Sequence, residues 1–455
     1  MSALAETRDP ATFDAEVAIL LDAAVARRVD AELFVSSARA TRVSVQDGEV
    51  EAFNLSAPRG IGIRVVSEGR VGYAFTESLA PEHLVAALER AGANAALLPP
   101  DDSAGLERFA GETPDVALYN PSLAEVPVPE KVAFALALDR VARGADARIE
   151  TVTGVSYADV DAFLRVASTL GVDRQYRGSI AGGGCMPKAS HGTENKMAAH
   201  YKRARAFEEL DAEAIAREAV RRSVEKLGSR TLESGHYPVA FHPEAFASLL
   251  DTFCGIFSGK AAQEGKSLLV GREGGQVAAP AFTLVDDPLR PGGFASRPFD
   301  DEGCVSRPFP LISEGVFAGF LHNAQTARKA ATRSTGHASR GGYSGTVHVS
   351  PSNLVVRAGA AAREALLASA PQVVYVTELM GLHAGASIVS GDFSLQAEGF
   401  LHSGGDRHPI HLFTVSGNFY RLLEQIEALA DDVETQPSGT TCPSVLVGGL
   451  TIAGK

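Results

Sequence analysis

The chain has 455 residues, of which 45% are hydrophobic and 21% charged, a composition typical of a soluble globular protein long enough for two domains. The net charge of −13 and the absence of a lysine- or arginine-rich run argue against a nucleic-acid surface and against anionic membranes, and no run reaches the roughly 20 apolar residues of a membrane span. Four cysteines without a C-x-x-C spacing, and an N-terminus without the basic and apolar regions of a signal peptide, lead us to expect a cytoplasmic protein.

The first half of the chain is predicted to combine helices with antiparallel strands. Helical spacing of apolar residues predicts helices over residues 14–29, 81–98 and 129–144, and Asp211 is a suitable N-cap for a fourth helix that ends at Gly228. Alternating patterns predict strands, with Asp47-Gly48 as a hairpin turn, over residues 32–37, 41–46, 49–55, 61–65, 71–75, 150–157, 163–169 and 200–206. We expect a surface loop over residues 99–126 and irregular structure over the glycine-rich residues 179–192.

Near residues 229–235 the long helical patterns give way to short apolar runs separated by glycine and proline. We expect these residues to be a linker between two domains. We predict an α+β fold with an N-terminal α/β domain over residues 1–230, built from antiparallel strands and flanking helices. Residues 231–455 are predicted to form a β-rich, barrel- or sandwich-like domain, because glycine and proline separate short apolar runs there. Helices over 360–370 and 419–430 and a last strand over 444–453 are expected within it.

A strand followed by a helix is predicted at the start of this second domain. Residues 237–241 alternate as a strand does, Pro243 suits the first position of a helix, and Gly259 suits its end. The helix is expected to bury one apolar face. Its residues are Phe246, Leu249, Leu250, Phe253, Cys254 and Phe257.

Common catalytic and cofactor signatures do not fit this chain. Residues 259–267 resemble a phosphate-binding loop but have one residue too many between the glycines and follow a helix. His408 and His411 are predicted to point to opposite faces of a strand, so ordinary strand histidines are favoured over a metal pair. Four further histidines could converge only through the fold: His322, His337, His348 and His383.

Seven short segments, in the same order along the chain, resemble those of the TldD/PmbA family of two-subunit bacterial metallopeptidases. They are residues 60–76, 299–303, 334–336, 390–394, 399–400, 415–418 and 445–454. In the catalytic TldD type, the helix after the central strand carries a His-Glu-x-x-x-His metal motif. Residues 248–258 of this chain contain neither His nor Glu, so it resembles the PmbA (TldE) type, which lacks that motif.

The resemblance implies that this chain has no catalytic residue, no metal site and no bound cofactor of its own. Cys442 lies in the region that supplies the third metal ligand in catalytic relatives. Without the two histidines, a single thiol does not bind Zn²⁺ with useful affinity. We therefore expect Cys442 to be a small residue packed behind the last strand.

Two polar clusters are our candidates for a substrate cleft. The first comprises Asp300, Asp301 and Glu302, and the second Asp392, Phe393 and Ser394. Adjacent carboxylates repel one another, which predicts hydrogen bonds from loop N–H groups or contact with a partner; the alternative is a solvated acidic turn. Asp392 is expected to cap a tight loop beside the cleft, or only to form the turn.

By resemblance, the chain is the non-metal-binding subunit of a cytoplasmic heterodimeric zinc metallopeptidase that degrades or trims unfolded peptides and leader peptides. A TldD-type partner would supply Zn²⁺ and a glutamate general base, and this chain one wall of a cleft that holds an extended peptide substrate. We expect the chain alone not to be catalytic. The alternatives are an independent hydrolase with a site of dispersed His, Cys and carboxylate residues, and a non-enzymatic peptide-binding or scaffold homodimer.

Overall fold

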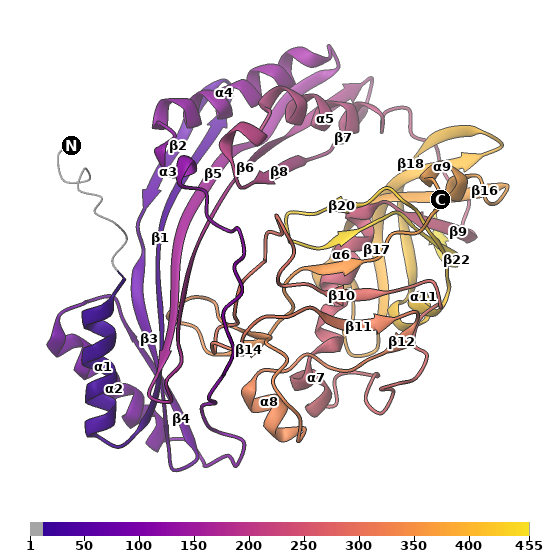
Figure 1. Cartoon of the computed structure of the whole chain (residues 1–455). Helices are drawn as coiled ribbons and strands as arrows, with labels where there is room; N and C mark the ends of the chain where they lie inside the picture. The colour runs from indigo at the N-terminus through magenta and orange to yellow at the C-terminus, as the bar shows by residue number, and fades with distance from the viewer. Residues whose placement is uncertain (1–11, 455) are drawn as a thin grey trace.

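The first half of the chain forms one curved antiparallel sheet with the strand order β4-β3-β1-β5-β6-β7, in which β2 also pairs with β1 and β8 with β6 (Figure 1). The structure is a computed structural model and describes residues 12–454; the segment on which the signal-peptide expectation rests lies outside this range. The strands are β1 (Asp30–Gln46), β2 (Glu49–Ser56), β3 (Arg59–Ser67), β4 (Arg70–Thr76), β5 (Ile149–Ser168), β6 (Asp173–His191), β7 (Glu194–Met197) and β8 (His200–Ala204).

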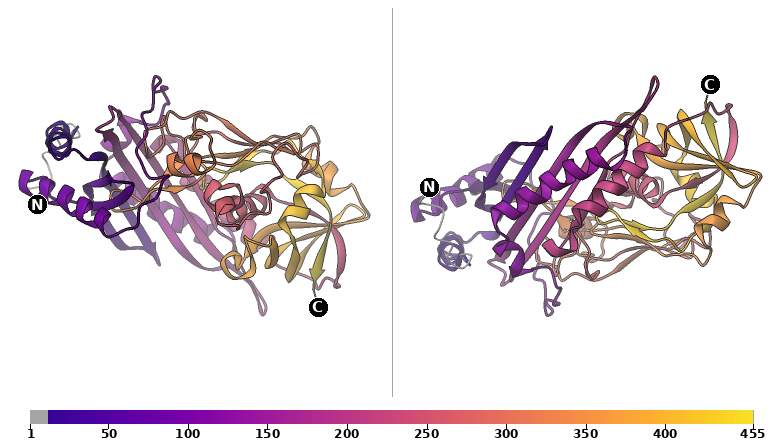
Figure 2. Two further views of the ribbon diagram at one scale, coloured as in Figure 1. Left: turned by 90° about the horizontal axis from the view of Figure 1, so that it is seen from below. Right: turned by 90° about the horizontal axis from the view of Figure 1, so that it is seen from above.

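Two pairs of helices cover this sheet at its two ends. Helices α1 (Asp14–Ala26) and α2 (Pro81–Ala96) pack together near β3 and β4. At the other end α4 (Val128–Ala145) and α5 (Ala212–Val224) lie side by side against β5 and β6 (Figure 2). The Asp211 side chain caps α5 as predicted, because it accepts hydrogen bonds from the N–H groups of Glu213 and Ala214 at 2.9 and 3.0 Å. The short α3 (Pro121–Glu125) and η1 (Phe207–Glu209) complete this half.

The second half is built around a closed five-stranded barrel. Strand β18 pairs with both β17 and β22, so the order β18-β17-β16-β9-β22 returns on itself, and β19 pairs with the outer side of β22. The predicted α+β class with a β-rich, barrel-like second part is therefore confirmed. The strands are β9 (Gly235–Phe241), β16 (Gln372–Met380), β17 (Asp392–Ser403), β18 (Asp406–Asn418), β19 (Ile426–Leu429) and β22 (Val445–Ala453).

A second sheet of short strands has the order β12-β11-β10-β15-β21-β20. Its strands, with the separate pair β13 and β14, are β10 (Leu284–Asp286), β11 (Phe309–Ser313), β12 (Val316–Phe317), β13 (Ala338–Ser339), β14 (His348–Val349), β15 (Leu354–Val356), β20 (Glu434–Thr435) and β21 (Thr441–Cys442). The helical turns of this half are α6 (Pro243–Phe253), η2 (Cys254–Phe257), α7 (Gly259–Gln263), α8 (Ala324–Lys329), α9 (Arg363–Leu367), α10 (Leu382–Gly385) and α11 (Phe419–Glu424).

Helix α6 lies inside the core of the second half, between the barrel and the second sheet. Its Phe246 ring lies 6.3 Å from that of Phe282, and its Phe253 ring stacks on Phe419 at 4.5 Å between centroids. The apolar residues predicted to face the core are buried, except that Cys254 is only half-buried. The helix is shorter than predicted, because α6 ends at Phe253, Cys254 and Phe257 belong to η2, and Gly259 begins α7. None of the described helices is long and apolar enough to cross a membrane.

The main error in the predicted elements is residues 179–192: residues 179–191 are not irregular but belong to the 19-residue strand β6, and Gly192 lies in the turn that follows it. Its three successive glycines serve close packing rather than a loop. A Cβ atom on Gly183 would lie 2.6 Å from the Phe134 ring, and one on Gly184 would lie 2.2 Å from the His200 carbonyl oxygen. Glycine therefore lets α4 and β8 approach the strand.

Other predicted boundaries shift because of tertiary pairing. The strands predicted over 32–37 and 41–46 form one strand, β1. Those predicted over 150–157 and 163–169 likewise form one strand, β5. Each is continuous because β1 and β5 pair with each other along nearly their whole length. The helix predicted over 419–430 ends at Glu424, since the next residues pair with β22 as β19.

The two halves meet through buried charges as well as apolar side chains. Arg64 on β3 binds Glu32 at 2.7 Å and Glu302 at 2.6 Å, and Arg340 also pairs with Glu32. All four side chains are almost completely buried. Each charge has an opposite partner, which offsets the cost of burying it, and the network joins the sheet of the first half to the loops of the second.

Candidate functional site

The structure brings Cys442 on β21 directly against helix α6, where the resemblance places the metal of catalytic relatives. The Cys442 thiol lies 3.0 Å from the carbonyl oxygen of Pro243 and is fully buried. The hydroxyl of Thr440 donates a hydrogen bond to the carboxylate of Asp251 on α6. This position therefore contains an aspartate, a threonine and one cysteine.

These groups do not fit a zinc ion. Burial, followed by the negative charges of Asp251 and Glu434, raises the pKa of the Cys442 thiol, so the thiolate form that zinc requires is disfavoured. Burial also raises the pKa of Asp251. Within residues 12–454, no group of three or more His, Cys, Asp or Glu side chains is arranged to hold a metal ion.

The acidic cluster at Asp300, Asp301 and Glu302 is buried, so the solvated turn considered as an alternative is wrong. Asp300 accepts hydrogen bonds from the N–H groups of Glu302, Cys304 and Ala338 at 3.0, 2.8 and 2.9 Å, and Asp301 accepts one from Arg340 at 2.6 Å. These are the loop N–H donors expected for adjacent carboxylates. A role for this cluster at a substrate cleft stays a prediction.

The second cluster begins strand β17, where side chains alternate between the two faces. Asp392 and Ser394 are exposed, whereas Phe393 is buried with its ring 6.3 Å from that of Phe253. Asp392 accepts a hydrogen bond from Asn418 at 2.8 Å, and this bond lowers the pKa of its carboxyl group. The exposed members remain available to a substrate or partner, and this role also stays a prediction.

Of the four dispersed histidines, His322 and His337 are buried, whereas His348 and His383 are exposed. His337 is fully buried, with its Nε2 2.6 Å from Asp286 and its Nδ1 2.8 Å from the Thr335 hydroxyl. A Thr-His-Asp arrangement of this kind resembles a catalytic relay, but neither His337 nor Asp286 is accessible. His411 is exposed and its Nδ1 lies 2.8 Å from the hydroxyl of Ser229.

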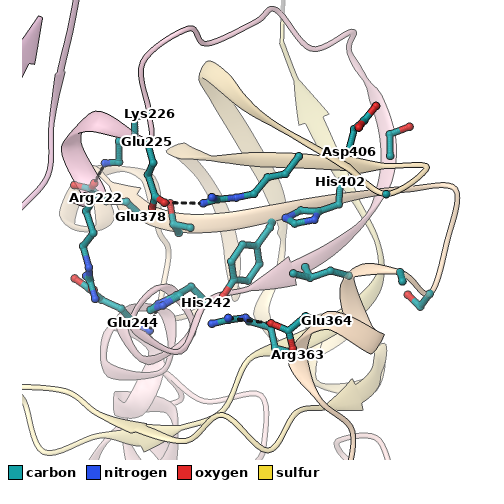
Figure 3. A pocket seen from close by; sticks show the side chains of 18 of the residues that line it. Arg222, Glu225, Lys226, His242, Glu244, Arg363, Glu364, Glu378, His402 and Asp406 are labelled. Carbon is teal, nitrogen blue, oxygen red and sulfur yellow. Dashed lines mark hydrogen bonds and ion pairs between the residues drawn. The ribbon is translucent and has the colours of Figure 1, made fainter. Parts of the chain in front are cut away.

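A large cavity, which sequence reasoning did not find, lies between the two halves (Figure 3). We call it the His402 cavity; its volume is about 920 Å³. Its walls come from α5 and the residues before β8 on one side, and from the start of α6, α9, β16 and the β17–β18 hairpin on the other. Its residues form no local motif, because they come from segments between Ala198 and Arg407.

Ion pairs hold the two sides of the His402 cavity together. Lys226 at the end of the α5 segment binds Glu378 at 2.6 Å and Glu398 at 2.7 Å, both on the barrel. Arg222 binds Glu244 at 2.6 Å, and Arg407 binds Glu225 at 3.1 Å. A ligand in this cavity would therefore contact both halves of the chain.

Three aromatic side chains line the barrel side of the cavity in a row. The ring centroid of Tyr375 lies 5.9 Å from that of His242 and 6.0 Å from that of His402. His242 caps α6, its Nδ1 accepting a hydrogen bond from the N–H of Glu244 at 3.1 Å. Burial, with the charges of Arg222 and Arg363, lowers the pKa of His242 to about 3, so it is neutral at pH 7.

Comparison with known proteins gives a consistent family match along the chain. Three family models match, described as PmbA/TldA metallopeptidase domain 1 (residues 31–95), central domain (121–227) and C-terminal domain (234–454). Metalloprotease PmbA of Escherichia coli O157:H7 is 29% identical over 96% of this chain and 95% of its own length.

Solved structures agree with this match. A putative modulator of DNA gyrase from Thermotoga maritima is 30% identical, with a TM-score of 0.89 over 97% of this chain and 100% of its own. TldE from Thermococcus kodakarensis is 25% identical, with a TM-score of 0.85 over 93% of this chain and 97% of its own.

Proposed function

The chain belongs to the TldD/PmbA family of metallopeptidases, and on this basis we propose that it is the non-metal-binding, PmbA/TldE-type subunit of a heterodimeric zinc metallopeptidase. The observation that carries the proposal is the composition of the site between α6 and β21. Asp251, Thr440 and the protonated Cys442 occupy the place where the resemblance expects metal ligands. The Thr440 hydroxyl donates to the Asp251 carboxylate, and the Cys442 thiol contacts the carbonyl oxygen of Pro243.

The partner in this proposal is a TldD-type subunit. Its Zn²⁺, when bound, would activate a water molecule with a glutamate as general base. The present chain contributes no acid, base or nucleophile; it forms one wall of the cleft and holds an unfolded peptide or leader peptide in extended form. We place the pair in the cytosol, which is supported by four cysteines that form no disulfide in the structure.

Reconstitution tests this proposal. The purified chain is mixed with the TldD-type homologue from the same organism, and zinc content, complex formation and cleavage of an unfolded protein substrate are measured. We expect no stoichiometric zinc and no cleavage with this chain alone, and activity from the mixture that neither chain shows alone. Cys442→Ala should leave the zinc content of the mixture unchanged, because the thiol is not a ligand.

Two results would contradict the proposal. About one Zn²⁺ per chain, removable by a chelator with loss of activity, would identify an independent metalloenzyme. A homologue that is fully active by itself, with which this chain forms no complex, would favour a scaffold function instead.

A further inference from the structure

A second, smaller groove lies between the two halves, where β3, β4 and α2 of the first half face a loop of the second. We call it the Arg90 groove. Its volume is about 540 Å³, within the range of roughly 300–1,000 Å³ found for small-ligand sites. The loop wall comes from residues 340–345, and the groove shares no lining residue with the His402 cavity.

The charge that lines the Arg90 groove has one sign. Of the described residues, Arg90 and Arg340 line it and no carboxylate does. Arg340 is paired with Glu32 and its side chain is only 1% exposed, so it offers no donor to a ligand. Arg90 is exposed and forms no ion pair with any described residue. Its one hydrogen bond among these residues is a long one, 3.4 Å to the carbonyl oxygen of Phe75, so most of its five N–H donors are available.

Two aromatic rings face the groove from its two walls. Phe75 on β4 is 46% exposed, and its ring centroid lies 6.0 Å from that of Tyr343 on the loop, with 49° between the ring planes. Tyr343 is held in place, because its hydroxyl donates to Glu77 at 2.6 Å and its ring fills the space beside Gly60, where a Cβ atom would come within 2.7 Å. Glu77 itself does not line the groove. A ring that is already fixed loses little freedom when a ligand packs against it.

The loop wall adds backbone donors. Tyr343, Ser344 and Gly345 all line the groove. Within residues 12–454, the N–H groups of Tyr343 and Ser344 form no hydrogen bond, so they are free to bind water or an acceptor group of a ligand. The groove therefore combines accessible donors and one unpaired positive charge with aromatic surface.

We propose that the Arg90 groove binds a small aromatic anion, whose carboxylate or phosphate group pairs with Arg90 and whose ring packs against Phe75 and Tyr343. A guanidinium group binds either anion through two parallel N–H donors. Tilted and edge-to-face contacts are favourable for a third ring beside the two that are present. A neutral ligand would leave Arg90 without a partner, and a ligand without a ring would leave Phe75 exposed.

The chain contains no tryptophan, so the fluorescence of an indole probe can be measured without background from the protein. The full-length chain is titrated into N-acetyltryptophan or into its neutral amide, and the anisotropy of the indole fluorescence reports binding. We expect the acid to bind about three- to fivefold more tightly than the amide, the gain expected from an ion pair with a partly exposed arginine. This preference should decrease at high salt, because salt screens an exposed ion pair.

Arg90→Gln should reduce binding of the acid to the level of the amide and leave binding of the amide unchanged, whereas Phe75→Ala should weaken both. Arg42→Gln is the matched control, because Arg42 is also an exposed arginine but lies on β1 and does not line the groove. Melting curves establish that each variant is folded. Equal binding of acid and amide, absence of binding, or an equal loss in the control would overturn the inference.

Competition separates the two anions and tests the ring. N-acetylphenylalanine carries a carboxylate and phenyl phosphate a phosphate, each with one aromatic ring. Displacement of the probe by either supports the inference, and the stronger competitor identifies the preferred anion; displacement by neither contradicts it. N-acetylalanine has the charge without the ring, so competition as strong as that of N-acetylphenylalanine would show that the aromatic contact is wrong. The titration uses no catalytic partner, so its failure is separate from failure of the reconstitution.

Discussion

At the scale of single residues, His242 links the pH to stability. It is neutral in the fold because burial and the charges of Arg222 and Arg363 lower its pKa from 6.5 to about 3. In the unfolded chain its pKa returns to 6.5, so unfolding at acidic pH takes up a proton. The contribution of His242 to the free energy of unfolding therefore decreases as the pH falls from 6.5 toward about 3.

We predict that His242→Asn weakens the dependence of the melting temperature on pH over this acidic range. Asparagine is chosen because it is also a good N-cap and preserves the start of α6. The measurement is a series of melting curves from pH 7 downward, with His383→Asn, at an exposed position, as the control. Parallel curves for the His242 variant and the unchanged chain would refute the assignment.

At the scale of elements, α6 organises the core of the second half. Leu250 is 0% exposed and belongs to the cluster that joins the helix to the barrel and the second sheet. We predict that Leu250→Ala lowers the free energy of unfolding by about 2–5 kcal/mol, the usual cost of truncating a core leucine. Denaturant titration measures this, and Ser248→Ala, on the less buried face of α6, should cost much less. A melting temperature equal to that of the unchanged chain would mean that Leu250 is not a core residue.

At the scale of the whole molecule, we predict a domain boundary near residue 230. The strands before it belong to one sheet and those after it to the barrel and the second sheet. The Arg230 side chain is exposed, but its backbone N–H donates to the Pro409 carbonyl and its carbonyl accepts from the His411 N–H, both at 2.9 Å. Limited digestion with trypsin should therefore cut slowly here and give two fragments that meet at Arg230. Arg230→Gln removes the cleavage site and should remove this pair of fragments. First cuts within residues 261–275, with none near Arg230, would count against the boundary.

The two fragments should stay together after cleavage. Arg64, Glu32, Glu302 and Arg340 form a buried network across the junction, and separating the halves would expose these charges and the adjacent apolar side chains to water. Size-exclusion chromatography of the digest is expected to show one species of the original size.

Features that depend on neighbouring residues were predictable from the sequence. The Asp47-Gly48 hairpin forms because both residues take positive φ angles, 51° and 81°. The cap at Asp211 and the buried face of α6 likewise follow from spacings of a few residues. Family membership was predictable because seven short segments keep the order in which they occur in the family. The resemblance to the type without the metal motif was also predictable, because residues 248–258 contain no histidine.

Features that depend on distant partners were decided only by the tertiary structure. The glycines of β6 were predicted to be irregular, because the sequence does not show that α4 and β8 pack against them. The sequence of the carboxylates at 300–302 is equally compatible with a solvated turn, since Glu302 is buried against Arg64, more than 200 positions away. The His402 cavity is the clearest case: its walls come from both halves, and only long-range folding brings Lys226 opposite His402. Local spacing determines caps, turns and helix faces, whereas burial and cavities arise from contacts between segments that the order of residues leaves far apart.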